Sequence, residues 1–204
     1  MVIDHCTYFL MENGTLLYDA MRCVGRIAFP VFAFLVAEGF AYTHNRKRYF
    51  AQLLAFALIS EVPWFLLNGA DGTHNVMFTL ALGVAALAIL EKLKENSILC
   101  GFAILSVTYL ATWLGTDYEW RGILMIAVFN LLRNQNTNLP IPYGRMMQIL
   151  CAFPLMMHYG SIGASLACMV IFLYDGTRGF IKGNVSKYGF YAFYPAHLYI
   201  IFIL

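Results

Sequence analysis

The chain has 204 residues, of which 61% are hydrophobic and only 12% are charged, and its formal net charge is +2. A soluble domain is about 45–50% apolar and about 25% charged, so this composition excludes an ordinary soluble protein. The low charge, without any basic stripe, also excludes a nucleic-acid-binding protein. We therefore expect a membrane protein whose partner is the lipid bilayer.

Apolar segments of helical length follow one another along the whole chain, separated by short polar loops. A membrane-spanning helix needs about 20 predominantly apolar residues, with about 17 as a lower limit. Several segments are shorter, so we expect bends and tilts. Because no internal repeat or linker divides the chain, we predict one all-α domain over 1–204, a polytopic membrane helix bundle of about nine transmembrane helices. The predicted helices are 1–12, 24–43, 49–67, 76–93, 97–114, 120–133, 145–159, 161–175 and 189–204.

Lysine and arginine gather in alternate loops, and this alternation favours nine crossings over eight. Cytoplasmic loops of membrane proteins carry an excess of these two residues. We therefore expect a protein of the inner (cytoplasmic) membrane, with its N-terminus in the cytoplasm and its C-terminus outside. The basic loops contain 46–48, 92–94, 133–145 and 178–187, and the predicted outer loops are 13–21, 68–75, 115–119 and 158–161.

Titratable side chains interrupt the apolar segments. A charged group near the bilayer centre costs about 2.5–3.5 kcal/mol on insertion scales, so such residues usually have a partner or a function. By helix rise, His5 lies about 12 Å from the outer boundary and His197 about 12 Å from the inner one, so the two can meet near the midplane. Because Pro63 and Pro195 also break helices here, we expect a polar interior cavity. The set is Asp4, His5, Glu38, Glu61 and His197, with Arg22 and Arg26 at an outer helix mouth.

Two spacings suggest shared helix faces. Asp19, Arg22 and Arg26 follow an i, i+3, i+7 pattern and share one face if the second helix extends back that far. Tyr194 and His197 are three residues apart. The tyrosine hydroxyl is thus placed either to orient the imidazole or to donate to a substrate.

Six segments carry a resemblance to a known family. In chain order they are "VIDHC", "RCVGRIAFPVFAFLVAEGFAYTHN", "YFAQLLAFALISEVPW", "NVMFTLALG", "DYEWRGILM" and "KYGFYAFYPAHL". Together they resemble the TraX family, membrane proteins associated with N-terminal acetylation of conjugative pilin, and the match runs almost end to end. The resemblance implies a membrane acetyltransferase that moves an acetyl group from acetyl-CoA to an amine or hydroxyl acceptor, such as a pilin N-terminus, without a metal.

The resemblance also assigns residues. Family members usually carry an apolar lead of a dozen or more residues before the Asp-His pair of the first helix, whereas Met1 here lies three positions before it. We therefore expect that the first helix is truncated, and that the true start lies upstream or the chain is a fragment. The residues that match the family's polar positions are Asp4, His5, Arg22, Arg26, Glu38 and Glu61.

His5 is the leading candidate for a catalytic base. Acyl transfer from a thioester needs a base for the nucleophile, stabilisation of the oxyanion and a positioned donor. Histidine suits the first task because its unperturbed pKa is near neutrality; a structural hydrogen bond between helices is the competing interpretation. Asp4 points about 100° away on a helix, so it is expected to hold a cation or a second histidine. His197 is the second candidate base, or else it fills the gap left by Pro195.

Contacts to the substrates are predicted from the remaining polar groups. The two arginines are expected to bind an acceptor carboxylate or to stabilise an oxyanion, unless they pair with Asp19 or Asp4. The two glutamates are more simply explained as partners of arginines. The predicted substrate-binding residues are Arg22, Arg26, Glu38, Glu61 and Tyr194, with Asn75, Asp117 and Tyr118 at the outer mouth.

Coenzyme A carries phosphates, so its site should be cationic. The densest basic cluster is His44, Arg46, Lys47 and Arg48, on the predicted cytoplasmic face where this donor resides. The competing interpretation is that a basic inner loop only sets the topology.

Two other functions compete with acetyl transfer. A multi-pass transporter or channel shares broken helices and buried charges, but secondary transporters often show repeated halves, and none is visible. A non-catalytic membrane scaffold has little reason to keep two histidines and several carboxylates at membrane depth. Acetyl transfer is therefore the preferred prediction.

Overall fold

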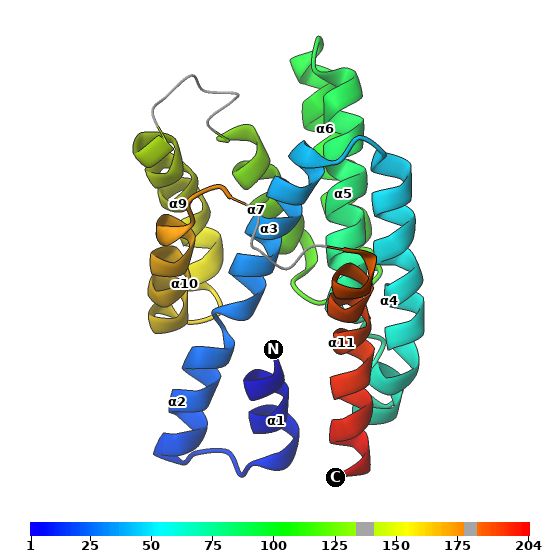
Figure 1. Cartoon of the computed structure of the whole chain (residues 1–204), viewed down its shortest axis with the longest axis vertical. Coiled ribbons are helices and arrows are strands. Elements are labelled where there is room, and N and C mark those ends of the chain that lie inside the picture. Colours follow the sequence, from blue (N-terminus) through cyan, green and yellow to red (C-terminus); the bar gives the residue numbers. More distant parts are fainter. Residues whose placement is uncertain (134–140, 178–182) are drawn as a thin grey trace.

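The computed structural model is a bundle of helices (Figure 1) and describes residues 1–133, 141–177 and 183–204. Over these ranges no β-strand forms, and a single isolated bridge joins His74 to Thr116. The prediction of an all-α membrane helix bundle is confirmed. The helices are α1 (Val2–Leu10), α2 (Leu16–Gly25), α3 (Ala28–Tyr42), α4 (Arg46–Asn68), α5 (Val76–Leu93), α6 (Ser97–Trp113), α7 (Glu119–Leu131), α9 (Ile141–Met157), α10 (Ser161–Leu173) and α11 (Asn184–Ile203).

The predicted outer loop 13–21 is wrong in its second half, because α2 begins at Leu16. The hydroxyl of Thr15 accepts a hydrogen bond from the Tyr18 amide at 3.1 Å, and such an N-cap stabilises a helix start by roughly 1 kcal/mol. Only a short break at 26–27 separates α2 from α3. Asp19 and Arg22 therefore lie on one helix, whereas Arg26, the third residue of the predicted i, i+3, i+7 face, is the C-cap residue of α2.

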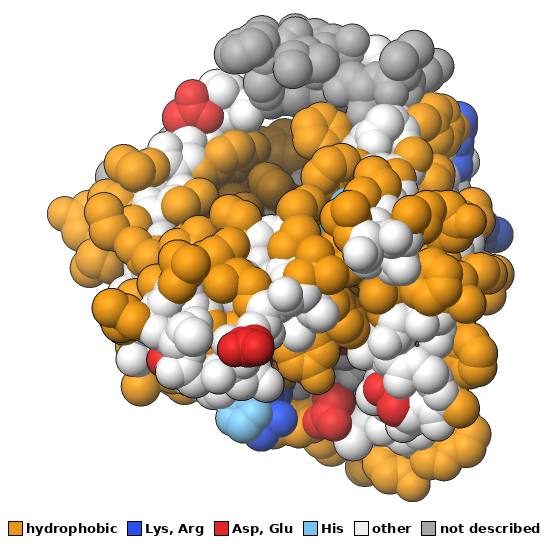
Figure 2. Space-filling model, turned by 90° about the horizontal axis from the view of Figure 1, so that it is seen from below, with side chains coloured by type: hydrophobic (Ala, Val, Ile, Leu, Met, Phe, Trp, Pro, Cys, Tyr) orange, Lys and Arg blue, Asp and Glu red, His pale blue; other side chains and the backbone are white. Residues whose placement is uncertain are grey.

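Among the residues that the structure describes, three helical segments are long and apolar enough to cross a membrane: Leu16–Tyr42, Arg46–Asn68 and Val76–Leu93. Large apolar side chains are exposed along the outside of the bundle, for example Leu58 on α4 and Phe102 on α6. Figure 2 shows the same character at one end of the molecule, where hydrophobic side chains cover most of the surface around a recess. Exposed apolar surface on this scale indicates contact with lipid.

Helices α3, α5 and α7 form the centre of the bundle. Phe34 and Phe129 are almost fully buried and meet edge to face, with ring centroids 5.4 Å apart. Helices α1, α2 and α11 stand at the lower end in Figure 1, below this core, together with the second half of α4. These elements supply residues that line the cavity described below.

The basic loops around 46–48 and 92–94 lie at the same end of the bundle (Figure 1). This agrees with the predicted alternation of charge. Parts of the other two basic loops, 134–140 and 178–182, lie outside the described residues, so the orientation of the chain in the membrane stays a prediction.

Candidate active site

A cavity of about 890 Å³ lies between α1, α2, α3, α4 and α11. Its volume falls within the range of small-molecule sites, roughly 300–1,000 Å³. One part of its wall is apolar and includes Leu35 and Leu53. The other part is polar and carries predicted site residues: Asp4, His5, Arg22, Arg26, Asp117, Tyr118 and Tyr194. A cavity that holds these predicted polar residues is therefore present, although apolar side chains make up most of its wall.

His5 and His197 are in direct contact. Helices α1 and α11 bring the two imidazoles together, with Nδ1 of His5 2.9 Å from Nε2 of His197. This confirms the prediction that the two can meet. His5 lines the cavity, whereas His197 is buried and is not among the lining residues.

The hydrogen bonds of this pair fix both tautomers. Nδ1 of His197 lies 2.9 Å from the carbonyl oxygen of Phe193, which can only accept, so this nitrogen carries a proton. In a neutral imidazole, Nε2 of His197 is then an acceptor, and Nδ1 of His5 donates to it. Nε2 of His5 therefore keeps its lone pair, and the pair presents an imidazole base to the cavity.

Asp4 pairs with Arg22, which confirms that Asp4 holds a cation. Nη1 of Arg22 lies 2.6 Å from Oδ1 of Asp4, and both side chains are mostly buried. Gly25 permits this approach of α1 to α2, because a Cβ atom there would lie 2.5 Å from Cβ of Asp4. The guanidinium of Arg22 also lies over the ring of Tyr8, 5.1 Å from its centroid. The pair fixes the position of the helix that carries His5.

The loop between α6 and α7 brings Asp117 and Tyr118 to the cavity beside Arg26. Burial raises the pKa of Asp117 to about 7, against the opposing effect of the Arg26 guanidinium. Tyr118 stacks on Phe29 with ring centroids 3.5 Å apart. Its φ of 66° is a left-handed conformation that is uncommon outside glycine, and such strain clusters at functional sites.

The loop between α4 and α5 is hydrogen-bonded to the loop between α6 and α7 at the cavity. The His74 amide donates to the carbonyl of Gly115 at 2.9 Å, and the Asp117 amide donates to the carbonyl of His74 at 2.8 Å. Gly115 has a φ of 63°, and a Cβ atom there would lie 2.6 Å from the carbonyl oxygen of Gly72. These contacts fix one side of the rim.

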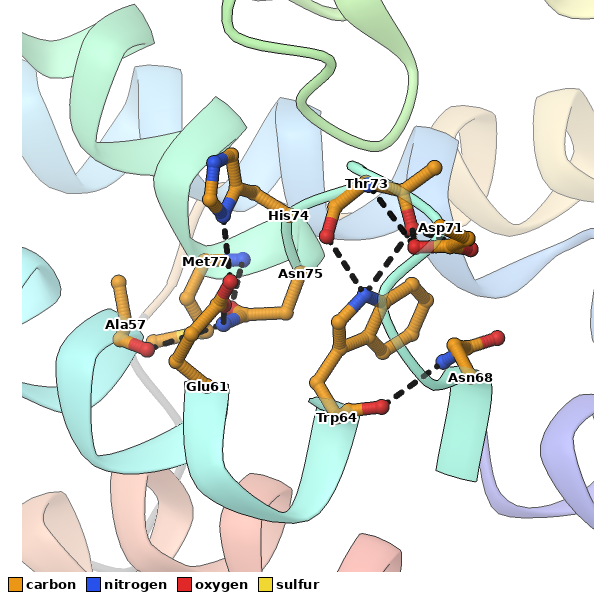
Figure 3. A network of polar contacts seen from close by, with 9 residues as sticks. All are labelled: Ala57, Glu61, Trp64, Asn68, Asp71, Thr73, His74, Asn75 and Met77. Carbon is orange, nitrogen blue, oxygen red and sulfur yellow. Dashed lines mark hydrogen bonds and ion pairs between the residues drawn. The ribbon is translucent and has the colours of Figure 1, made fainter. Parts of the chain in front are cut away.

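Glu61 binds the start of α5 rather than an arginine, so that interpretation is wrong for this residue (Figure 3). Nδ2 of Asn75 donates to Oε2 of Glu61 at 2.6 Å and to the Ala57 carbonyl at 2.9 Å. Nδ1 of His74 contacts the other carboxylate oxygen. Glu61 and Asn75 are not among the residues that line the cavity, so they support its wall from behind.

Glu38 lies outside the cavity lining. Its Oε1 is 3.2 Å from Nε of Arg133, and both side chains are buried. The interpretation of Glu38 as a partner of an arginine is confirmed. Arg145, whose guanidinium lies 4.8 Å over the ring of Phe34, belongs to the same region of the bundle.

The predicted coenzyme A cluster lies around the start of α4. Arg46 contacts the carboxylate of Glu91 twice, at 3.3 Å each, while His44, Lys47 and Arg48 are exposed. None of the four lines the cavity, which reaches α4 as far as Tyr49. Their role toward coenzyme A stays a prediction. In the part of the chain that the structure describes, no group of three or more His, Cys, Asp or Glu side chains is placed to hold a metal ion.

Sequence reasoning missed Trp64, which lines the cavity beside the histidine pair. Its ring packs edge-on to His5 with centroids 6.3 Å apart, and Nε1 donates to the Thr73 carbonyl at 3.2 Å. The available signal was a tryptophan directly after Pro63, in a helix expected to bend next to a buried carboxylate.

Comparison with known proteins points to one family. The model of the TraX protein family matches residues 1–204. The chain is 27% identical over 226 residues to "Probable fimbrial assembly protein FimC, serogroup H1" of Dichelobacter nodosus, a match that covers 97% of this chain and 88% of that protein. It is 26% identical over 147 residues to "Uncharacterized protein RP591" of Rickettsia prowazekii (strain Madrid E), covering 69% of this chain and 54% of that one. No solved structure matches.

Proposed function

This chain belongs to the TraX family, and we propose that it is an integral membrane acetyltransferase that moves an acetyl group from acetyl-CoA to an amine or hydroxyl acceptor. The observation that carries the proposal is the His5–His197 pair, in which Nε2 of His5 has no proton and His5 lines the cavity. The similarity to a protein named for fimbrial assembly supports a pilin N-terminus as the acceptor.

In the proposed reaction His5 is the general base. Nε2 of His5 takes a proton from the acceptor as the acceptor attacks the thioester carbonyl, a contribution of typically 10²–10⁴-fold in rate. The positive charge that forms on His5 is stabilised by His197, whose Nε2 accepts the hydrogen bond from Nδ1 of His5. Asp4 and Arg22 act indirectly, because their ion pair holds α1 in place.

The acceptor approaches from the polar side of the cavity. Asp117 and Arg26 line this side, so a carboxylate is available for an acceptor ammonium and a guanidinium for its carbonyl oxygens. We place both groups at the acceptor subsite, together with Tyr118. An ammonium bound by Asp117 first gives up one proton to water, and the neutral amine that results is the nucleophile from which His5 takes the second proton during attack.

The donor is proposed to come from the cytoplasm, with the protein in the inner membrane and its N-terminus cytoplasmic. Because Arg46 is already bound to Glu91, phosphate contacts fall to His44, Lys47 and Arg48. Tyr49, which follows this cluster directly, lines the cavity. The flexible arm of acetyl-CoA that carries the acetyl group can therefore extend along α4 from the basic cluster toward the histidine pair.

The test uses purified protein in lipid nanodiscs with acetyl-CoA and a pilin N-terminal peptide, and it measures release of free CoA. We expect His5→Gln to lower the rate at least about 100-fold. Tyr109→Phe, which alters an exposed residue of α6 outside the cavity wall, is the control and should keep the wild-type rate. No release by the wild type, or equal release by His5→Gln, would overturn the proposal. Uptake of a solute into liposomes without CoA release would favour the transporter.

A further inference from the structure

Tyr194 is a buried polar residue that the proposed base leaves unexplained. Its side chain is 4% exposed and lines the cavity, yet its hydroxyl forms no hydrogen bond of ordinary geometry within the protein. A buried polar group without a partner is destabilising. The ring packs edge-on against both imidazoles, with centroids 6.2 Å from His5 and 5.3 Å from His197. The hydroxyl therefore orients neither imidazole and is available to a ligand.

Val76, the first residue of α5, lines the cavity together with Tyr194. First-turn N–H groups have no partner within their helix and lie at the positive end of its dipole. The N-cap residue Asn75 accepts from one of them, the Met77 amide, at 3.1 Å. The positive end of the α5 dipole therefore lies at the cavity wall to which Tyr194 belongs, where it favours a developing negative charge.

We propose that Tyr194 is a further catalytic residue, whose hydroxyl donates to the thioester carbonyl oxygen and stabilises the oxyanion that forms there. This inference rests on the proposed acetyl transfer and deepens it. Three observations favour Tyr194 over an arginine in this role: its donor is unpartnered, it lines the cavity, and it packs against the ring of His5. Arg22, by contrast, is already held by Asp4 at 2.6 Å.

The complete step uses only the two substrates and these side chains. A bond forms between the acceptor nitrogen and the carbonyl carbon, the acceptor proton passes to Nε2 of His5, and the carbonyl π electrons move to the oxygen that Tyr194 binds. Collapse of this intermediate re-forms the carbonyl and breaks the carbon–sulfur bond. The departing CoA thiolate takes the proton back from His5.

Tyr194→Phe keeps the ring and removes only the donor. Loss of one oxyanion donor costs about 10²–10³-fold in kcat, and we expect the KM for acetyl-CoA to stay unchanged. Tyr199→Phe is the matched control, since Tyr199 lies on the same helix, is 51% exposed and is not part of the cavity wall. It should keep the wild-type rate. Thermal unfolding of both variants reports whether the fold is intact.

A second measurement separates oxyanion stabilisation from a packing role. Replacing the thioester oxygen of the donor by sulfur weakens its capacity to accept a hydrogen bond. The wild type should lose rate with this dithioester donor, whereas Tyr194→Phe should lose far less, because both changes remove the same contact. Wild-type kcat in Tyr194→Phe, or an equal sulfur effect in both proteins, would overturn the role of Tyr194 and leave that of His5 intact. If the wild type releases no CoA, both proposals fail.

Discussion

Replacing His197 by leucine removes the group that accepts the Nδ1 proton of His5. A hydrogen bond to a charged group is worth about 1.5–3 kcal/mol, and the charge on His5 develops only as the acceptor attacks, so this amount is added to the barrier. At about 1.36 kcal/mol for each factor of ten, kcat should fall about 10- to 160-fold. His197 is not among the residues that line the cavity, so the KM for acetyl-CoA should not change.

The assay is CoA release in nanodiscs over a range of acetyl-CoA concentrations, which separates kcat from KM. His197→Gln is the conservative variant, because its amide oxygen can accept from Nδ1 of His5, and its rate should lie between those of the wild type and His197→Leu. Thermal unfolding shows whether the variants are equally folded. The reasoning is refuted if His197→Leu keeps the wild-type kcat, or if the glutamine and leucine variants lose the same rate.

Three further predictions concern the surroundings of the pair. Glu38→Gln breaks a buried ion pair and should lower the free energy of unfolding by about 3–5 kcal/mol; an unaltered thermal unfolding midpoint contradicts this. Gly25→Ala places a methyl group 2.5 Å from Cβ of Asp4 and should lower the free energy of unfolding by about 1–3 kcal/mol. The control is Gly101→Ala, whose methyl group meets only open space and should lower this free energy far less. Equal thermal unfolding midpoints of the two variants would exclude the clash. Asp117, with its pKa raised to about 7, binds a proton more tightly in the folded chain, so its contribution to stability is present below about pH 4 and is lost as the pH rises through about 7. Asp117→Asn should flatten this part of the stability curve, and an identical curve would show that another group titrates there.

The helices and the histidine contact could be predicted because the bilayer constrains both. Lipid imposes a length and an apolar composition on each membrane helix. Counting the helical rise from the two membrane boundaries predicted that His5 and His197 lie at the same depth in the bilayer, and in the structure the two imidazoles are in contact. The start of α2 could not be predicted in this way. Polar residues over 12–15 indicate a loop, and only the structure shows that Thr15 caps a helix there.

The partners of the buried carboxylates depend on tertiary contacts that spacing does not reveal. Asp4 meets Arg22 because α1 and α2 pack closely at Gly25, and the sequence offered this pair only as one of two alternatives. Glu61 meets His74 because the loop 69–75 folds back against α4. The conformation of this loop depends on backbone hydrogen bonds between His74 and residues Gly115 and Asp117 of the loop between α6 and α7. Such contacts between distant loops leave no periodic pattern in the sequence.

The backbone bonds that tie His74 to Gly115 and Asp117 join two loops that are far apart in the sequence. The contact of His74 with Glu61 anchors the same joint to α4. The position of Asp117 at the cavity therefore depends on α4, so a substitution of Glu61 is expected to displace the proposed acceptor subsite although Glu61 does not line the cavity.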